Sequence, residues 1–424
     1  MLRLPAGLPP TARVRMSTPP APSRREYYRL GILLGALTAM GPLAIDMYLP
    51  SFPAIAGELG TTTAAVQATA AAYFLGLAFG QAFYGSFSDR VGRKLPLYVG
   101  LVLFIAASIG CALATSVEAL GVLRFVQALG GCAEMVVARA VVRDRFAERD
   151  GIRVLSLLLL VMGAAPILAP TIGGQLLLAF GWRSIFWVLA AYGVAGLVAV
   201  VALLPETLPP ARRQAHSFGR LLRVYGTLLR DRRYMAYVLA GSFIISGMFA
   251  YIAGSPFVFI ELFGVPPDRY GILFGANAFG LIAASQVNGR LAQRVDPRRV
   301  VRVVLPVSAA AGLVLLGSTL TGIGGFPGLL APLFVFVASL GFVLPNTTVL
   351  AMAPHGSVAG SASALMGTVQ FLLGAVAGGL VGVLANGTAV PLGAVIAACG
   401  LAAVVAYARA DGGAPLAAPA AANE

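Results

Sequence analysis

The chain has 424 residues, of which 58% are hydrophobic and only 11% are charged, and its formal net charge is +14. Soluble domains carry roughly twice that share of charged residues, so this composition excludes a soluble globular protein and predicts a polytopic membrane protein. The three cysteines lie inside apolar runs and the two histidines lie in loops without metal-ligand spacing. We therefore expect no disulfide framework, no metal site and no cofactor.

Twelve apolar runs follow one another along the chain. Each is about long enough to cross a hydrocarbon core of roughly 30 Å as a helix. The expected fold is an all-α polytopic membrane protein with twelve transmembrane helices. The runs fall near residues 30–51, 64–87, 96–115, 118–142, 152–179, 182–204, 234–261, 268–290, 302–321, 326–350, 358–383 and 386–408.

The basic residues are distributed unevenly between the connections. If successive runs alternate in direction, 26 of the 30 Lys and Arg fall on one side and only Arg183 and Arg269 on the other, while Arg124 and Arg139 lie within a run. This asymmetry follows the positive-inside rule and places both termini in the cytoplasm. The positive charge is therefore a topology signal, and no nucleic-acid partner is needed to explain it.

The longest internal connection, residues 205–233, carries three prolines and seven arginines and separates six runs from six. We therefore expect two six-helix bundles, at residues 27–204 and 234–410, joined by a cytoplasmic linker. Residues 1–26 are rich in Pro and Arg, and residues 411–424 in Ala, Pro and Gly. Both ends are predicted to be disordered tails, because neither carries enough apolar residues to build a core.

The first run contains one acidic residue, Asp46, about five residues from its outer end. Arg124 in the fourth run lies at a similar depth, because the two runs cross in opposite directions. Ionisable groups at such depth cost several kcal/mol unless they face partners or water. We therefore expect an Asp46–Arg124 pair, which either only fixes helix packing or belongs to a proton or substrate relay.

A short basic turn, GSFSDRVGRK at residues 85–94, joins the second and third runs. It closely resembles the signature loop between the second and third helices of major facilitator superfamily transporters, which implies that fold. Arg93 is expected to pair with Asp144, and Asp89 to sit at a helix N-terminus across the interface between the halves. Such contacts would latch the cytoplasmic side; alternatively the basic residues only anchor the turn. The residues of this latch are Gly85, Asp89, Arg90, Gly92, Arg93, Lys94 and Asp144.

The fourth run holds a second buried acid, Glu134, with no cation within one turn. A desolvated carboxyl group there would load and release a proton. We therefore hypothesise that Glu134 and Asp46 form the proton-coupling set, with Arg124 as the switchable counter-charge. Arg124 and Gln127 resemble the superfamily's Arg-x-x-Gln-Gly motif, which implies proton coupling, although Ala128 replaces its usual Gly.

The fifth run combines prolines and glycines at short spacing. Proline removes a helix hydrogen bond, and glycine lets helices approach closely. The pattern resembles the fifth-helix motif of superfamily exporters and suits a gate between the halves, although a kinked packing helix would leave the same mark. The residues are Gly163, Pro166, Pro170, Gly173 and Gly174.

A weaker copy of the basic turn follows the eighth run, at Gly289 to Arg298. Gly85 and Gly289 are 204 residues apart, about the length of one half. The copy has Gln293 where the first turn has Asp89, so any ionic latch should be weaker there. Matching turns in two halves predict a parallel, pseudo-symmetric six-helix repeat, as in transporters whose halves rock against each other.

The second half has no acidic residue in its predicted membrane interior. Instead it carries amide and tyrosine side chains among aromatic residues, which suit a small, mostly apolar ligand. We therefore expect a substrate cavity that draws on both halves. Its candidate residues are Tyr48, Tyr73, Gln127, Tyr251, Asn277, Asn346 and Gln370.

The segments from Asp46 to Pro53 and from Gly360 to Gln370 narrow the resemblance to the Bcr/CflA branch of drug:proton antiporters. It covers roughly residues 30–408 and implies proton-driven export of small amphipathic drugs across a bacterial cytoplasmic membrane, by a monomer embedded in the bilayer. The alternative is a proton-coupled importer of a small nutrient on the same fold. A membrane enzyme would need converging nucleophilic or metal-binding groups, and a receptor would not need Asp46 and Glu134 in the membrane.

Overall fold

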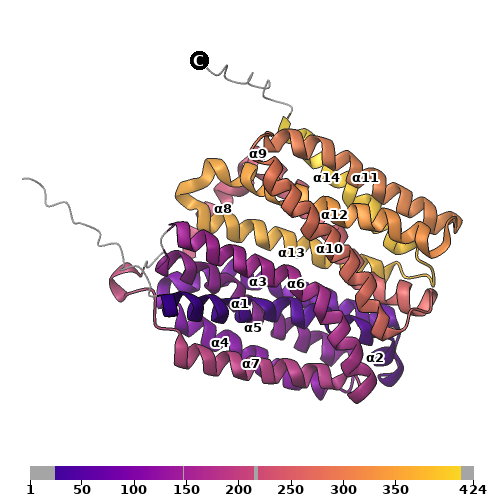
Figure 1. Ribbon diagram of the computed structural model, residues 1–424, viewed down its shortest axis with the longest axis horizontal. Coiled ribbons are helices and arrows are strands. Elements are labelled where there is room, and N and C mark those ends of the chain that lie inside the picture. The colour runs from indigo at the N-terminus through magenta and orange to yellow at the C-terminus, as the bar shows by residue number, and fades with distance from the viewer. Residues whose placement is uncertain (1–23, 147, 214–217, 412–424) are drawn as a thin grey trace, which may run out of the picture.

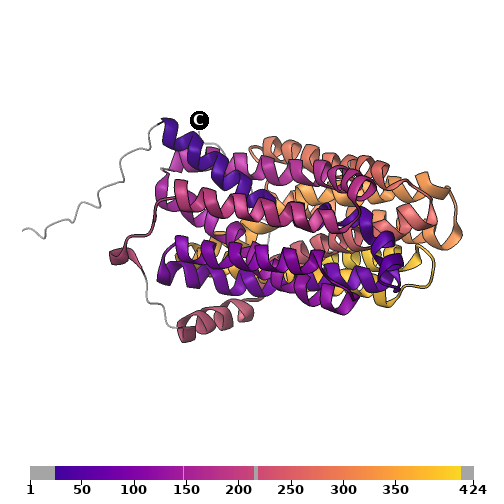
Figure 2. The ribbon, with the colours of Figure 1, turned by 90° about the horizontal axis from the view of Figure 1, so that it is seen from below.

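Long helices run side by side along the long axis of the molecule (Figure 1 and Figure 2). The computed structural model describes residues 24–146, 148–213 and 218–411, and no strand occurs within them. Twelve of the described helices are long and apolar enough to cross a membrane, which confirms the expected all-α polytopic fold. The elements are α1 (Arg24–Asp46), η1 (Leu49–Ser51), α2 (Phe52–Glu58), α3 (Thr63–Val91), α4 (Lys94–Ala112), α5 (Val117–Arg145), α6 (Glu148–Phe180), α7 (Arg183–Leu203), η2 (Pro210–Arg212), α8 (Phe218–Arg230), α9 (Arg232–Pro256), η3 (Phe257–Leu262), α10 (Pro267–Leu291), α11 (Pro297–Thr321), α12 (Gly325–Met352), η4 (Ala353–Val358), α13 (Ala359–Val383) and α14 (Val390–Asp411).

Two groups of helices make up the molecule, α1 to α7 in indigo to magenta and α9 to α14 in orange to yellow (Figure 1). We refer to them as the first and second halves. In the first half α5 packs against α3 and α4, and in the second α9 packs against α13 and α14. Large apolar side chains such as Val194, Val198 and Val307 point outward and are exposed, as expected for surfaces that face lipid.

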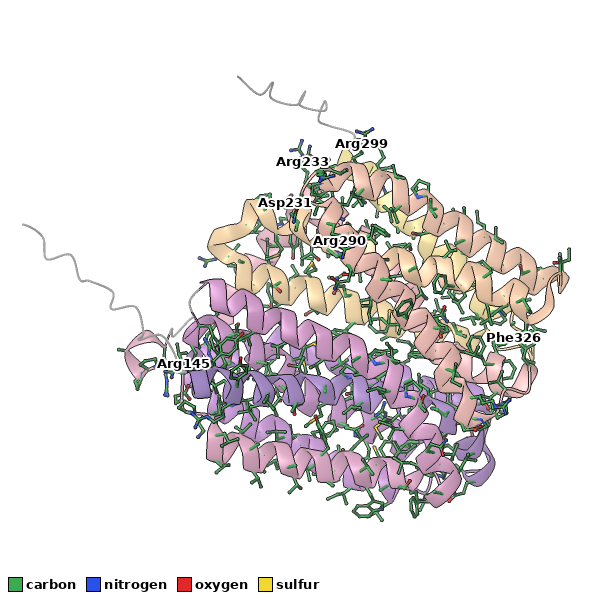
Figure 3. All side chains as sticks on the ribbon, in the orientation of Figure 1. Arg145, Asp231, Arg233, Arg290, Arg299 and Phe326 are labelled. Carbon is green, nitrogen blue, oxygen red and sulfur yellow. The ribbon has the colours of Figure 1, made fainter. Side chains whose placement is uncertain are left out.

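The two ends of the molecule differ in charge. The described chain begins and ends near the same end, where α8 also lies (Figure 1). Arg145, Arg233 and Arg299 gather toward this end, whereas Phe326 lies at the opposite one (Figure 3). We name these the basic end and the distal end. Their separation agrees with the uneven distribution of arginine in the sequence.

The halves meet through α3 against α13 and through α6 against α10. Their approach is close toward the distal end. A methyl group at Gly382 would lie 3.1 Å from the carbonyl oxygen of Ala64, and one at Gly174 would lie 2.6 Å from that of Pro267. The Thr63 hydroxyl also donates a hydrogen bond to the Glu261 carboxylate, which joins α3 to η3. The halves are therefore closed against each other at the distal end.

Three local features depart from the predicted boundaries. Helix α1 begins at Arg24, inside the segment predicted as a tail; residues 1–23 and 412–424 of the predicted tails lie outside the described residues. The first predicted run, residues 30–51, is divided, because α1 ends at Asp46 and the chain continues into η1 and α2.

The linker also contains helix α8, which was not predicted. Leu221 and Leu228 of this helix are buried, and the Tyr225 hydroxyl donates to the Ala82 carbonyl oxygen at 3.5 Å. These three residues recur at helical spacing and form an apolar face. The high arginine content of the linker concealed this pattern at the sequence level.

Candidate functional site

One face of α5 carries three buried polar groups, Arg124, Gln127 and Glu134. Arg124, Gln127, Gly131 and Glu134 recur at intervals of three and four residues and therefore share a stripe of the helix. The Arg124 guanidinium is 1% exposed and donates from Nη1 to Gln127 Oε1 at 2.5 Å. Gln127 in turn donates to Ser108 Oγ on α4 at 2.7 Å. The stripe thus begins with a buried cation held by neutral polar groups.

Aromatic rings complete the surroundings of Arg124. Its guanidinium carbon lies 4.2 Å from the centre of the Tyr73 ring and 4.6 Å from that of Tyr48, and Phe186 is 5.8 Å away. Ring faces attract a desolvated guanidinium by about 2 kcal/mol. Three residues expected in the substrate cavity, Tyr48, Tyr73 and Gln127, are therefore brought together around the cation.

The predicted Asp46–Arg124 ion pair is not formed. Among the described residues, no carboxylate is paired with Arg124, whose Nε atom also has no hydrogen-bond partner. Asp46 is 3% exposed at the end of α1 and lies within electrostatic range of Tyr251 and Tyr270 in the second half. Similar depth was not enough to bring the two side chains together, because aromatic rings and Gln127 surround Arg124 instead.

Glu134 lies further along the same stripe and is 1% exposed. Neither of its carboxyl oxygens has a hydrogen-bond partner in the described part of the chain, and the Tyr73 hydroxyl also has none. A methyl group at Gly131 would lie 3.5 Å from that hydroxyl oxygen, so Tyr73 reaches along the stripe between Arg124 and Glu134. Tyr73 is within electrostatic range of Arg124, Glu134 and Asp46. These are the three residues predicted to couple protons.

An ionic cluster lies at the basic end, in the turn between α3 and α4. Arg93 is 2% exposed and donates from Nε to Asp144 Oδ2 at 2.7 Å, which confirms the predicted pair. Its Nη1 donates to Asp89 Oδ1 at 2.7 Å and to Ser88 Oγ at 3.0 Å. Arg93 therefore links the end of α3 to the end of α5.

Glu206, which follows α7, closes the other side of this turn and was missed from the sequence. Its carboxylate accepts hydrogen bonds from the backbone N–H groups of Arg93 at 2.9 Å and of Lys94 at 3.2 Å. Partial burial raises the pKa of Glu206, but the backbone N–H bonds lower it by more, so the pKa lies below its usual value. The carboxylate sits at the N-terminus of α4, where the helix dipole favours an anion.

Gly92 explains why the turn needs glycine at that position. Its φ angle is 103°, in the region that favours glycine, and a methyl group there would lie 2.5 Å from Glu206 Oε2. Gly85, by contrast, has no neighbour within 4 Å of such a methyl group. Of the two glycines in the predicted pattern, the local structure therefore requires only Gly92.

Asp89 does not sit across the interface between the halves. In the described part of the chain its ion pairs join Arg93 at 2.7 Å and Arg143 at 3.9 Å, both in the first half. Asp89 and Arg93 are four residues apart across the end of α3, so the pair forms locally. Lys94 lies 5.6 Å from the centre of the Tyr98 ring, and among the described residues no contact of the Arg90 side chain supports a latch. The cluster thus braces one half internally, and a latch between the halves stays a hypothesis.

The fifth-helix motif lies in α6, where this helix meets α1 and α10. Pro166 and Pro170 lie inside the helix. A methyl group at Gly173 would collide with the Met47 backbone, and one at Gly163 would lie 3.2 Å from the Ile282 side chain. Gly163, and Gly174 against Pro267, therefore line the contact between the halves, whereas Gly173 packs within the first half. This is the place that a gate would occupy.

The second half has a neutral polar and aromatic interior. Asn277 Nδ2 donates to the Tyr251 hydroxyl at 3.0 Å, and the Tyr251 ring stacks on Phe274 with centroids 5.3 Å apart. Asn346 Nδ2 donates to Asn288 Oδ1 at 2.7 Å, which links α12 to α10. Asn288 was missed because a lone Asn near a helix end resembles a surface residue.

Gln370 lies on α13 and Gln81 lies on α3, two helices through which the halves meet. Gln370 is half-buried on α13. A methyl group at Gly367, three residues earlier, would lie 3.2 Å from the Gln81 side chain of α3. Gln81 donates to the Met135 sulfur at 3.4 Å and was also missed. Within the described residues, no cluster of His, Cys, Asp or Glu could hold a metal ion.

Most of the chain matches a known protein family. The model of the Major Facilitator Superfamily matches residues 34–379. The chain is 40% identical over 377 residues to the uncharacterized MFS-type transporter YdgK of Bacillus subtilis, covering 88% of this chain and 93% of that protein.

Two other relatives have more specific names. The chain is 32% identical over 376 residues to a bicyclomycin resistance protein homolog of Haemophilus influenzae, covering 89% of this chain and 94% of that protein. It is 30% identical over 335 residues to the multidrug resistance protein MdtL of Escherichia coli, covering 79% and 83%.

Solved structures share the fold at low sequence identity. The D-xylose–proton symporter matches with a TM-score of 0.68 at 15% identity, covering 89% of this chain and 97% of the other. A bacterial homolog of the human lysosomal transporter Spinster, in an inward-facing and occupied conformation, also matches with a TM-score of 0.68 at 15% identity, covering 92% and 97%. At this identity the two structures support the fold alone.

Proposed function

The chain belongs to the Major Facilitator Superfamily of membrane transporters, and from this premise we propose that it exports small amphipathic compounds in exchange for protons. The family consists of transporters and not of enzymes. Relatives with the words bicyclomycin resistance and multidrug resistance in their names support export of foreign compounds. Gly163 and Gly174 of α6 lie at the contact between the halves, as a gate of an exporter would require.

Glu134 is the observation that carries proton coupling. Its carboxyl group is buried and has no partner, so an ionised form would cost several kcal/mol within a membrane. We therefore assign Glu134 a bound proton in the state that is closed at the distal end. Substrate or water that reaches the carboxyl group would stabilise the anion and release this proton.

Arg124 and Asp46 would connect this proton to movement of the halves. Arg124 lies ten residues before Glu134 on one helix, about 15 Å along the axis, and shares Tyr73 with it. Asp46 lies near the tyrosines of the second half, so its charge would act on the contact between the halves. In this scheme the basic end faces the cytoplasm of a bacterial cell, in accord with the positive-inside rule.

The substrate surface would combine the first-half rings with the second-half aromatic cluster. Tyr251, Phe274 and Asn277 offer flat apolar surface with one amide, which suits an amphipathic molecule better than a sugar.

The test compares Glu134→Gln with the wild-type protein in an efflux-deficient bacterial host. A panel of antibiotics and dyes, with and without an uncoupler, identifies transported compounds. Proteoliposomes with an imposed pH gradient then measure coupling. We expect uncoupler-sensitive resistance from the wild type and loss of gradient-driven transport in Glu134→Gln, with substrate binding retained because Gln keeps the shape of the side chain.

Glu118→Gln is the matched control, because Glu118 is an exposed acid at the distal end of the same helix. It should transport as the wild type does. If host cells that carry the protein become hypersensitive and accumulate more of a compound, the protein is a proton-coupled importer and not an exporter. Full gradient-driven transport by Glu134→Gln would remove Glu134 from the mechanism.

A further inference from the structure

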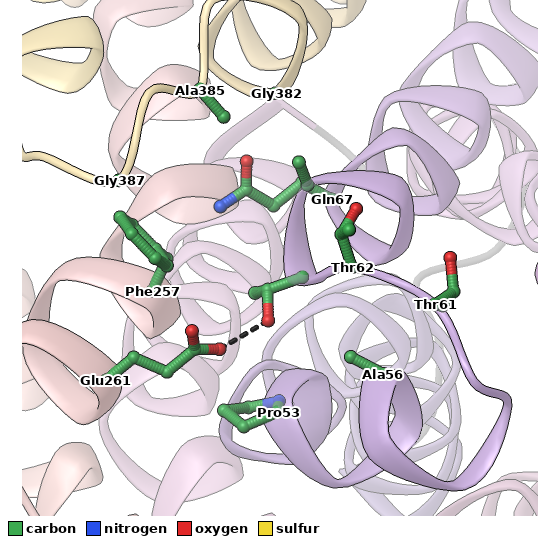
Figure 4. A pocket seen from close by; sticks show the side chains of 12 residues that line it. Pro53, Ala56, Thr61, Thr62, Gln67, Phe257, Glu261, Gly382, Ala385 and Gly387 are labelled. Atoms are coloured by element: carbon green, nitrogen blue, oxygen red, sulfur yellow. Dashed lines mark hydrogen bonds between the residues drawn. The ribbon is translucent and has the colours of Figure 1, made fainter.

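A cavity of about 610 Å³ lies at the distal end between the two halves (Figure 4). Its wall comes from α2 and the start of α3 in the first half, and from η3 and the end of α13 in the second. This volume is in the range of small-molecule sites. The cavity lies apart from the Arg124–Glu134 stripe, and none of the residues predicted for transport lines it.

Among the residues that line this cavity, Glu261 alone is charged, and the other polar side chains are Gln67 and the threonines at 61–63. The Glu261 carboxylate uses one oxygen to accept a bond from Thr63. Gln67 is 2% exposed, and its Oε1 atom has no partner. None of the lining residues is Lys or Arg, so the carboxylate has no counter-charge in the wall.

The remaining wall is apolar. Pro53 and Ala56 form one side, and the Phe257 side chain lies between Glu261 and Gln67 in the close view (Figure 4). A carboxylate beside an aromatic ring suits a cation that also has an apolar body. We propose that this cavity binds a small organic ammonium ion, whose N–H groups donate to Glu261 and whose apolar part lies on Phe257.

Such a ligand would bridge the halves, because Glu261 belongs to the second half and Gln67 to the first. A ligand that binds only the state closed at the distal end shifts the protein toward that state. Bound from the outside, it would slow the opening step of the transport cycle. This inhibitory effect rests on the proposed export function, whereas the binding does not.

Binding is measured on the full chain in lipid nanodiscs at neutral pH without a gradient, by isothermal titration. The probes are 4-phenylbutylammonium and its neutral analogue 4-phenylbutanol. We expect the ammonium to bind about tenfold or more tightly than the alcohol, because only the ammonium can form a charge-assisted hydrogen bond with the Glu261 carboxylate. Glu261→Gln should remove this preference, and Glu118→Gln, which removes another exposed distal-end carboxylate, should keep it.

A second variant, Phe257→Leu, tests the same site in case Glu261→Gln does not fold. It should weaken ammonium binding severalfold while the protein stays monodisperse. Equal binding of the two probes, or an unchanged preference in Glu261→Gln, would overturn the proposal. Ammonium added outside should also inhibit export by the wild type but not by Glu261→Gln. If the ammonium binds through Glu261 but no compound is exported, the site is supported and the proposed function is wrong. If compounds are exported but the ammonium does not bind through Glu261, only the proposed site is wrong.

Discussion

The two turns at the basic end occupy matching places in the two halves but are stabilised differently. In the first turn, between α3 and α4, Arg93 contacts Asp144, which is 51 residues away, and Glu206 caps α4 from 113 residues away. In the second turn, between α10 and α11, Asp296 caps α11 locally by accepting from the Arg298 N–H at 2.7 Å. No ion pair involving Arg290, Arg294 or Arg298 is found among the described residues.

The interiors of the two halves show the same contrast. The first half buries Arg124 and Glu134 without an ionic partner, whereas the second buries amides and tyrosines that bond to one another. Buried charged groups that lack an ionic partner respond strongly to water, protons and ligands, whereas neutral groups that are hydrogen-bonded to one another do not. The repeated fold therefore supports two kinds of chemistry, a responsive half and a stable half.

Among the variants that test this contrast between the halves, Arg124→Lys should have the largest effect. Lysine keeps the positive charge but cannot stack a planar guanidinium on Tyr73 and Tyr48 while donating to Gln127. The lost ring contacts, worth about 2 kcal/mol, predict a fall in export of tenfold or more. Transport in proteoliposomes, normalised to protein content, measures the effect. Wild-type export by Arg124→Lys would show that charge alone matters at this position.

Gly92→Ala and Gly289→Ala test the comparison of the two turns directly. Alanine at Gly92 meets an unfavourable φ angle and the Glu206 carboxylate, so a stability loss of about 1–3 kcal/mol is expected. Gly289 lies inside α10 with open space around it, and alanine there should be neutral or slightly stabilising. Apparent unfolding temperatures in detergent compare the two variants. Equal shifts would show that the first turn is no more demanding than the second.

The sequence predicted the twelve spans from length and hydropathy, and the Arg93–Asp144 pair from two opposite charges in connections on the same side of the membrane. It placed Asp46 opposite Arg124 because depth was the only coordinate that the chain order supplies. Rotation about the helix axes decides which side chains meet, and that depends on packing. Glu206 and Glu261 were missed for the same reason: each acts on a residue more than 100 positions away.

Tyr251→Phe should lower stability, whereas Tyr73→Phe should not. The Tyr251 hydroxyl accepts a hydrogen bond from Asn277, so its removal should cost about 0.5–1.5 kcal/mol. The Tyr73 hydroxyl is buried without a partner, so its removal should leave stability unchanged or raise it. The same unfolding assay measures both variants. A destabilised Tyr73→Phe would show that this hydroxyl has a partner that matters for folding.

The smallest effect concerns the remote cap of α4. Because the pKa of Glu206 lies below its usual value of 4.5, its ionised form stabilises the folded state. This contribution is fully present above pH 4.5 and is lost as the pH falls through the lowered pKa. Glu206 is exposed, so solvent screening limits the contribution to at most about 1 kcal/mol. The difference in apparent unfolding temperature between wild type and Glu206→Gln should therefore stay constant from pH 7 to about 5 and shrink below 4.5. Asp296→Asn, which retains a good local cap for α11, should show little difference at neutral pH. If Glu206→Gln and Asp296→Asn lose the same stability, the remote cap of α4 stabilises the first half no more than the local cap of α11 stabilises the second.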